Sequence, residues 1–308
     1  MIRVDGMAKR YGDGPLVVQD LSFEVGEGEV YGLLGANGSG KSTSVGMLAT
    51  LVAPTAGRAT VAGHDVVARP ERVRAAIGVT LQEAGVDPES TPRQLLGLHG
   101  RLLGLDRASA TARAQELLDV FDLADRRADQ RVKELSGGNR RRLDLAVALV
   151  GRPGVVFLDE PTTGLDPISR AALWGEVRRL RAEGTTVLLT TQYLDEADRL
   201  ADRIGILADG RLAAEGTPAE LKRRVGGDVL TVTLDPADAG RAASVLGGRV
   251  EESGAAVSLR VEDGGEAVPR VLERLRAEDL DARGVALARP TLDDVFLEVA
   301  DRRLAEVA

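Results

Sequence analysis

The sequence predicts an α/β protein built on a parallel β-sheet, followed by a smaller α+β module. The first observation is a glycine-rich loop, Gly35–Ser42, that lies between an apolar strand and a helix. The second is a pair of continuous apolar or β-branched runs, Val155–Leu158 and Thr186–Thr190, of the kind that forms strands buried on both faces. The third is a change near Gly226-Gly227 to alternating strands, which are typical of an antiparallel sheet.

The elements of the first part follow in order along the chain. Residues 1–31 alternate apolar and polar positions in short runs, which predicts antiparallel strands with one solvated face. Val30–Leu34 predicts a buried strand leading into the glycine-rich loop, and Lys41–Leu51 predicts the helix after it. Ile77–Leu81 predicts a further strand, and residues 92–150 have the apolar spacing of helices.

The remaining elements complete the parallel sheet and then form a second module. Helices are expected at Ser169–Ala182 and Leu194–Ala201, which gives βαβ units. Farther along, the order strand, helix, strand, strand, helix, strand predicts a ferredoxin-like module at about 228–290. A last helix is expected at Thr291–Val299. We therefore expect two domains, residues 1–224 and residues 225–308.

The composition is that of a globular protein with an acidic surface. The chain has 308 residues, 44% apolar and 29% charged, which suits about two domains with substantial cores. Its net charge of −8 argues against nucleic acid as a partner and against a direct lipid anchor. It has no cysteine, no apolar run of about 20 residues and no apolar core of a signal peptide near Met1. We expect a cytoplasmic protein.

The glycine-rich loop fits the pattern G-x-x-x-x-G-K-[ST], which binds the phosphates of a nucleoside triphosphate. Its glycines allow backbone N–H groups, together with the positive end of the following helix, to face phosphate oxygens. We expect Lys41 to contact the β- and γ-phosphates, Ser42 to bind Mg²⁺ and Thr43 to bond the α-phosphate. The expected nucleotide-binding residues here are Gly35, Asn37, Gly38, Ser39, Gly40, Lys41, Ser42 and Thr43. The alternative is a glycine-rich turn before a helix.

Two acidic residues follow the apolar strand at 155–158. Asp159, at the end of that strand, is expected to hold Mg²⁺, and Glu160 is the candidate general base or water-orienting group. General-base catalysis typically supplies roughly 10²–10⁴-fold, so positioning and charge neutralisation must supply the rest. The alternative is a solvated Asp-Glu turn. The glycine-rich loop upstream favours the catalytic interpretation over this alternative.

A second glycine-rich motif, Leu135–Asn139, opens a helix. Ser136 resembles an N-cap, and the N–H groups of Ser136, Gly137 and Gly138 are expected to hold a γ-phosphate. Because the domain already has one phosphate loop, we expect this segment to face the nucleotide of a second copy. The result is a homodimer with nucleotide sandwiched between its chains. The alternative is simply a capped helix start.

Residues 1–224 resemble an ATP-binding cassette (ABC) nucleotide-binding domain, a P-loop NTPase fold with an antiparallel β subdomain and a helical subdomain. The motifs above occur in the order of that family. The resemblance implies that Tyr11 stacks on adenine, and that Gln82 binds Mg²⁺ and links it to the transmembrane partner. It also implies that Asp166 belongs to a loop that crosses the dimer interface.

Two positions depart from the common pattern of the family. Asn139 stands where glutamine is common, and Gln192, a candidate catalytic residue, stands where most members have histidine. Glutamine can hydrogen-bond a γ-phosphate, but it cannot carry a proton or a charge. A histidine-based acid–base mechanism is therefore excluded.

Three segments are similar to the daunorubicin-resistance type of drug-export ATPase: Leu189–Asp198, Arg140–Ala146 and Pro290–Leu297. In that subgroup glutamine at position 192 and an added C-terminal module are regular features. The subgroup resemblance implies a membrane half that is a separate chain. The arginine run Arg140–Arg142, taken alone, predicts a solvated helix face, and no ligand is assigned to it.

These observations predict an ATPase with ATP and Mg²⁺ as its ligands. It is expected to power efflux of a drug-like or lipid-like compound through a separate integral membrane permease subunit. It would then lie at the inner face of the cell membrane, held there by its partner. The alternatives are a soluble cassette ATPase that acts on nucleic acid or the ribosome, and a regulatory module that senses nucleotide.

Overall fold

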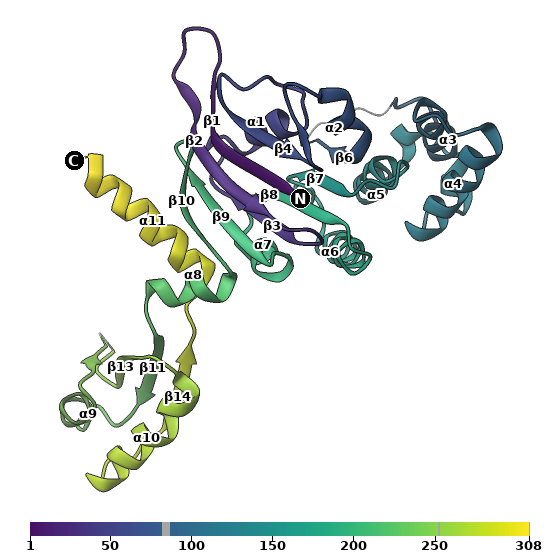
Figure 1. Ribbon diagram of the computed structural model, residues 1–308. Helices are drawn as coiled ribbons and strands as arrows, with labels where there is room; N and C mark the ends of the chain where they lie inside the picture. The colour runs from purple at the N-terminus through teal and green to yellow at the C-terminus, as the bar shows by residue number, and fades with distance from the viewer. Residues whose placement is uncertain (82–86, 252, 308) are drawn as a thin grey trace. The chain divides into compact units, whose positions relative to one another are not determined.

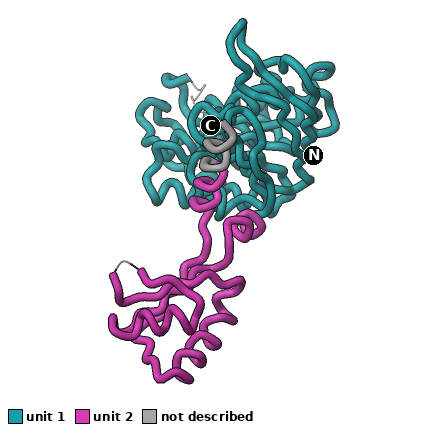
Figure 2. Tube along the Cα trace, turned by 90° about the vertical axis from the view of Figure 1, so that its left-hand side faces the viewer, with its two compact units in different colours: residues 1–217 teal, residues 218–308 magenta. Residues whose placement is uncertain are grey.

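The computed structural model describes residues 1–81, 87–251 and 253–307. The chain divides into two compact units, Met1–Thr217 and Pro218–Ala308, which Figure 2 draws in two colours. The predicted domain boundary after residue 224 stays a prediction. Among the described residues, no helix has both the length and the apolar character that a membrane span requires.

A mostly parallel sheet forms the centre of the first unit, with the strand order β10-β9-β3-β8-β7-β6 (Figure 1). Strands β9, β3, β8, β7 and β6 run parallel, and β10 is antiparallel to β9. The strands are β3 (Val30–Leu34), β6 (Ile77–Thr80), β7 (Val155–Asp159), β8 (Thr186–Thr191), β9 (Arg203–Ala208) and β10 (Arg211–Gly216). Every residue of β3, β7 and β8 is buried, which confirms the expectation from their continuous apolar runs.

An antiparallel sheet in the order β2-β1-β4-β5 lies beside it in the same unit. Its strands are β1 (Ile2–Arg10), β2 (Leu16–Val25), β4 (Ala56–Val61) and β5 (His64–Asp65). Buried and exposed positions alternate along much of β1 and β2, as the sequence predicts. The buried side chains, such as Val4 and Leu21, share one apolar cluster with Leu33 of β3, Val45 of the following helix and Phe157 of β7.

The helices of the first unit are α1 (Lys41–Leu48), α2 (Pro70–Ala76), α3 (Pro92–Leu102), α4 (Arg107–Val120), α5 (Gly137–Ala148), α6 (Pro167–Ala182) and α7 (Leu194–Leu200), with short 3₁₀ turns η1 (Arg126–Asp129) and η2 (Val132–Glu134). Helix α1 is shorter than the predicted helix that ended at Leu51. It ends at Leu48, and Thr50 takes a left-handed backbone conformation with φ of 62°. Residues 92–150 are mostly helical, as expected.

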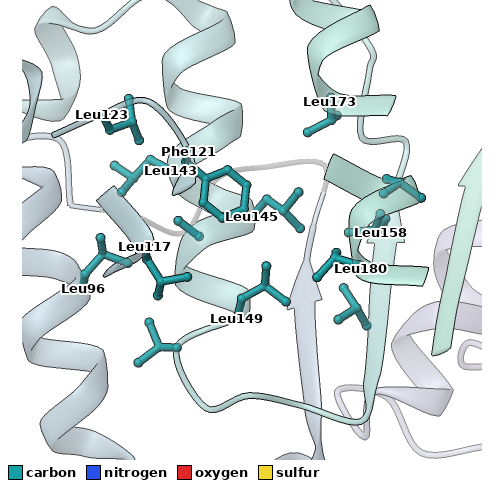
Figure 3. Close-up of a cluster of buried hydrophobic side chains, with 14 of the residues drawn as sticks. Leu96, Leu117, Phe121, Leu123, Leu143, Leu145, Leu149, Leu158, Leu173 and Leu180 are labelled. Carbon is teal, nitrogen blue, oxygen red and sulfur yellow. The ribbon is translucent and has the colours of Figure 1, made fainter. Parts of the chain in front are cut away.

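One apolar cluster joins helices α3, α4 and α5 to α6 and to the central sheet (Figure 3). Its members include Leu96, Leu117, Phe121, Leu143, Leu145, Leu149, Leu158, Leu173 and Leu180. Leu143 and Leu145 of α5 are fully buried in it, together with Leu158 of β7. Helix α5 is therefore packed directly onto the part of the sheet that ends in the two acidic residues.

The second unit contains a ferredoxin-like module. Its sheet has the order β12-β13-β11-β14 with antiparallel neighbours. Its elements are α8 (Pro218–Val225), β11 (Asp228–Thr233), α9 (Ala239–Leu246), β12 (Arg249–Val250), β13 (Ala256–Val261), α10 (Gly264–Ala277), β14 (Gly284–Ala288) and α11 (Leu292–Val307). From β11 to β14 the chain follows the predicted order of strands and helices, so that prediction is confirmed. Leu230, Val232 and Leu246 belong to its separate core.

Candidate active site

The glycine-rich loop connects β3 to α1, and two of its positions cannot hold a larger residue. A Cβ added at Gly35 would lie 2.5 Å from the carbonyl oxygen of Leu207. Gly40 has a φ of 103°, in the left-handed region, and its added Cβ would lie 2.8 Å from the carbonyl oxygen of Val17. The loop is therefore held close to neighbouring backbone on one side.

The predicted nucleotide-binding residues of this loop differ in their exposure to solvent. Asn37, Gly38 and Ser42 are exposed, and Thr43 is half-buried. The hydroxyl oxygen of Ser39 is buried and has no hydrogen-bond partner among the described residues. Because an unsatisfied buried hydroxyl is unfavourable, a phosphate oxygen bound beside it would supply the missing partner.

Lys41 is the buried cation of the loop. Its side chain is 4% exposed, and Nζ donates hydrogen bonds to the carbonyl oxygens of Gly35 at 2.9 Å and Ala36 at 3.1 Å. Nζ also lies 3.3 Å from Oε1 of Glu160, whose side chain is 6% exposed. A buried ammonium needs such partners, and phosphate oxygens could replace them without leaving the charge unpaired.

Asp159 ends β7 and receives two hydroxyl groups. Its Oδ1 accepts hydrogen bonds from Ser42 Oγ at 3.2 Å and from Thr190 Oγ1 at 2.5 Å. Mg²⁺ prefers oxygen ligands and is usually held by one or two protein groups together with substrate phosphates and water. The oxygens of Ser42 and Asp159 fit a magnesium ion that is bound together with a nucleotide.

Glu160 has a strained backbone conformation. Its φ is 46°, in the left-handed region that a residue with a side chain rarely adopts. Such strain costs about 1–3 kcal/mol and persists only when surrounding contacts enforce it. The Glu160 N–H donates to the Thr190 carbonyl oxygen at 3.1 Å and to Thr190 Oγ1 at 3.0 Å. Its Oε2 accepts a hydrogen bond from Thr163 Oγ1 at 3.2 Å, which helps to orient the carboxylate.

Gln192 follows the end of β8 and is half-buried. The preceding residue, Thr191, accepts a hydrogen bond at its carbonyl oxygen from the Gly35 N–H at 3.3 Å. Thr191 Oγ1 also accepts one from the Tyr193 N–H at 2.9 Å. Gln192 therefore follows a residue that is hydrogen-bonded to the glycine-rich loop. It lies at the edge of the sheet where β3, β7 and β8 end.

A second group of predicted residues lies at the starts of α5 and α6. Ser136 caps α5 by accepting a hydrogen bond from the Asn139 N–H at 3.3 Å. Asp166 caps α6, and its carboxylate accepts hydrogen bonds from the Ser169 N–H at 2.9 Å and Ser169 Oγ at 2.6 Å. These hydrogen bonds lower the pKa of Asp166. A Cβ added at Gly138 would lie 2.5 Å from the same Ser169 Oγ, so the two helix starts are in contact.

The two groups are separate within one chain. In the parts of the chain that the structure describes, no hydrogen bond or ion pair joins Ser136, Gly137, Gly138 or Asp166 to the side chains of Lys41 and Glu160. The ring of Tyr11 is a third, isolated feature. It is 49% exposed, and Lys9 Nζ lies 5.0 Å from its centroid. Gln82 lies outside the described residues.

Arg141 of α5 was missed by the sequence analysis. The expected solvated face of Arg140–Arg142 is wrong at this position, since the Arg141 side chain is 11% exposed. Its guanidinium donates to the carbonyl oxygens of Asp159 and Glu160, among others. The run of three arginines is charged throughout, so nothing in the local pattern distinguishes the one whose guanidinium is held by backbone carbonyl groups.

These geometries define the class of protein. Phosphoryl transfer needs phosphates held in place, their charge neutralised and a water molecule oriented. The loop with Lys41, the Ser42–Asp159 pair and Glu160 provide groups for these three tasks at the carboxyl edge of one parallel sheet. The chain is a P-loop nucleoside triphosphatase.

Comparison with known families identifies the type. Residues 18–163 match the family described as ABC transporter, and residues 216–300 match the C-terminal domain of DrrA1-3-like ATP-binding proteins. The daunorubicin resistance ATP-binding protein DrrA3 of Streptomyces coeruleorubidus is 50% identical, with 100% of this chain and 98% of that protein covered. The Nod factor export ATP-binding protein I of Burkholderia lata is 42% identical, with 97% and 96% covered.

Solved structures show the same fold for the first unit. An ATP-binding subunit of an ABC transporter is 30% identical, with a TM-score of 0.66 and coverage of 72% of this chain and 92% of that chain. The cassette MJ0796, in a dimeric post-hydrolysis state bound to ADP and Pi, is 25% identical, with a TM-score of 0.65 and coverage of 70% and 98%.

The chain therefore belongs to the ATP-binding subunits of ABC transporters, in the daunorubicin-resistance group. It is an ATPase subunit that powers export. The resemblance noted from the motifs is confirmed. A role on nucleic acid or as a pure nucleotide sensor is not favoured, because relatives that match over the full length are resistance and export proteins.

Proposed function

We propose that two copies of this chain bind two ATP molecules with Mg²⁺ in the seam between them. Each composite site is formed by Gly35–Thr43, Asp159 and Glu160 of one copy and by Ser136–Gly138 of the other. Hydrolysis then reopens the dimer. ATP can drive such a change because it binds the closed state more tightly than the open one.

The observation that supports this proposal most is the separation of two half-sites on one chain. Lys41 and Glu160 form a buried ion pair at the sheet edge, whereas the capped start of α5 lies apart from it beside Ser169. Helix starts bind anions, so the second half-site suits a phosphate held mainly by another copy. Dimeric cassettes among the similar solved structures agree with this arrangement.

In the loaded site, each of these residues has a distinct task. Lys41 would move from loop carbonyl oxygens to the β- and γ-phosphates. Ser42 and Asp159 would hold Mg²⁺, which neutralises charge on the phosphates. Glu160 would accept or orient a proton of the attacking water. Gln192 would hydrogen-bond the γ-phosphate without carrying charge.

Three further residues complete the proposed site. The exposed ring of Tyr11 would stack on adenine. Gln82 would bind Mg²⁺ and contact the membrane partner, and Asp166 would lie at the interface between the two copies.

The transported compound and the partner are also part of the proposal. The chain would act with a separate integral membrane permease subunit, at the cytoplasmic face of the membrane. Its cargo would be drug-like or lipid-like, because the relatives named above are a daunorubicin resistance protein and a Nod factor export protein. Neither nucleic acid nor direct lipid anchoring is part of this function.

The variant Glu160→Gln tests the proposal. ATP turnover by the full chain, with its membrane partner present, should fall by about 10²-fold or more, because the general base is lost. ATP binding should remain. Glu71→Gln, an exposed glutamate of α2, is the matched control and should keep wild-type turnover. Equal turnover in the wild type and Glu160→Gln would contradict the proposal.

A further inference from the structure

Arg141 makes an unusual set of contacts for one side chain. Its Nε donates to the Pro161 carbonyl oxygen at 2.8 Å, and its Nη1 donates to that of Leu81 at 3.0 Å. Its Nη2 donates to the carbonyl oxygens of Asp159 at 3.2 Å and Glu160 at 2.8 Å. Four carbonyl groups from two segments of chain therefore meet one half-buried guanidinium, which has five N–H donors in a rigid plane.

These contacts fix the backbone on which Glu160 sits. The Glu160 N–H is held from β8 by Thr190, and its carbonyl oxygen is held from α5 by Arg141. The peptide groups on both sides of a left-handed residue are thus restrained by different elements. Since left-handed backbone is unfavourable for glutamate, removal of either restraint would let the turn relax and redirect the carboxylate.

The same arginine lies close to the second half-site. Arg141 is in the second turn of α5, whose start is capped by Ser136 and contains Gly137 and Gly138. Leu143 and Leu145, on the same helix, are fully buried in the cluster of Figure 3, so α5 moves as one packed body. A displacement at the capped end is therefore transmitted to the Glu160 turn through the guanidinium.

We propose that Arg141 is a positioning residue that couples the two composite sites of the dimer. Phosphate held at Ser136–Gly138 belongs to one site, and Glu160 of the same chain serves the other site. The rigid connection from α5 through Arg141 makes the orientation of Glu160 depend on occupancy of the neighbouring site. This inference rests on the proposed dimer and adds a device for cooperative hydrolysis.

The test compares Arg141→Gln and Arg141→Lys with Arg142→Gln in the full chain together with its membrane partner. Lysine keeps the charge but has one compact ammonium group in place of the planar fork. Arg142 is the adjacent arginine, with Asp122 as its ion-pair partner at 3.6 Å, and serves as the matched control. The measurements are kcat, the Hill coefficient for ATP, the Kd for ATP and the thermal midpoint.

Both Arg141 variants should lose about 10–100-fold in kcat, as expected for a misplaced catalytic group. Their Kd for ATP should stay within about twofold of wild type, because within the described part of the chain no hydrogen bond or ion pair joins Arg141 to the glycine-rich loop. The Hill coefficient should fall from above one in the wild type toward one. Arg142→Gln should keep all wild-type values.

Other outcomes would overturn the inference. A kcat within about twofold of wild type in Arg141→Gln would remove the positioning role. Loss of ATP binding and of thermal stability in both Arg141 variants would assign Arg141 a structural role only. A Hill coefficient of one in the wild type would contradict the proposed coupling. So would a Hill coefficient in the Arg141 variants that equals the wild-type value. Absence of wild-type turnover would instead contradict the proposed function.

Discussion

A single hydroxyl group, that of Thr190, serves both acidic residues of the site. It donates to Asp159 Oδ1 at 2.5 Å and accepts from the Glu160 N–H at 3.0 Å. Thr190 is fully buried, and Asp159 and Glu160 are 3% and 6% exposed, so little water is available to replace these hydrogen bonds. Charge-assisted hydrogen bonds of this kind are short and strong, and they fix the direction of the carboxylate.

Replacement of Thr190 by valine keeps the shape and removes the hydroxyl. We expect a loss of about 1–3 kcal/mol in the free energy of unfolding, because a buried carboxylate loses a donor. ATP turnover should fall as well, since both acidic residues shift. Thr186→Val is the matched control on the same strand: Thr186 Oγ1 accepts from the Gly28 N–H at 2.9 Å, away from the site. It should lose stability but keep turnover, and equal turnover losses would refute this role of Thr190.

Asp144 provides a second prediction at the scale of the residue. Burial raises its pKa to about 6 from the ordinary value of 3.8, although Arg141 and Arg140 oppose the change. The folded state thus binds the proton more tightly, so the stability from this group is complete well below pH 3.8 and is lost as pH rises through about 6.

Asp144→Asn should therefore stabilise the protein at pH 8 by about 1–3 kcal/mol, because a neutral amide replaces the ionised carboxylate that burial disfavours. Well below pH 3.8 the variant and wild type should be nearly equal, since the aspartate is then protonated in both the folded and the unfolded state. Denaturant unfolding at the two pH values checks this. Equal destabilisation at both would show that the amide disrupts packing and that the ionised carboxylate is not the cause.

At the scale of the element, Asp166 caps the start of α6 and holds Ser169, which lies against Gly138 at the start of α5. Asp166→Ala should cost about 0.5–2 kcal/mol in stability, because the N-cap is lost. It should also lower turnover, since Ser169 Oγ would no longer be held against Gly138. Asp166→Asn can still cap the helix and should retain most turnover. Should asparagine be as harmful as alanine, the charge of Asp166 would be what matters.

The sequence predicted elements well where the pattern was local. Strands β3, β7 and β8 are buried on both faces, so their apolar runs identify them directly. The end of α1 was predicted too late, because the chain leaves the helix through a left-handed threonine, Thr50. Threonine is disfavoured in that conformation, and a local pattern gives no sign of it.

The same distinction applies to the site. Lys41, Ser42, Asp159 and Glu160 lie in short motifs, and the structure brings them together as expected. Arg141 could not be found in this way, because its carbonyl partners come from chain segments 18 to 60 residues away. Such partners are set by tertiary packing and carry no side-chain signature.

At the scale of the whole molecule, the chain carries two half-sites and a separate ferredoxin-like module. The nucleotide-binding loop and the start of α5 belong to the same compact unit, yet among the described residues no hydrogen bond or ion pair joins Ser136 to Lys41. In the proposed function, completion of a site requires a second copy. This requirement distinguishes an ABC ATPase from a nucleotide-binding protein that is active as a single chain.

The most direct test is the mass of Glu160→Gln in solution, alone and with its membrane partner, measured by light scattering. With ATP and Mg²⁺ the cassette should have the mass of two chains, because hydrolysis no longer reopens the closed state. With ADP it should have the mass of one chain when alone. A variant that stays a single chain at saturating ATP, and that brings only one copy to the membrane partner, would contradict the shared site.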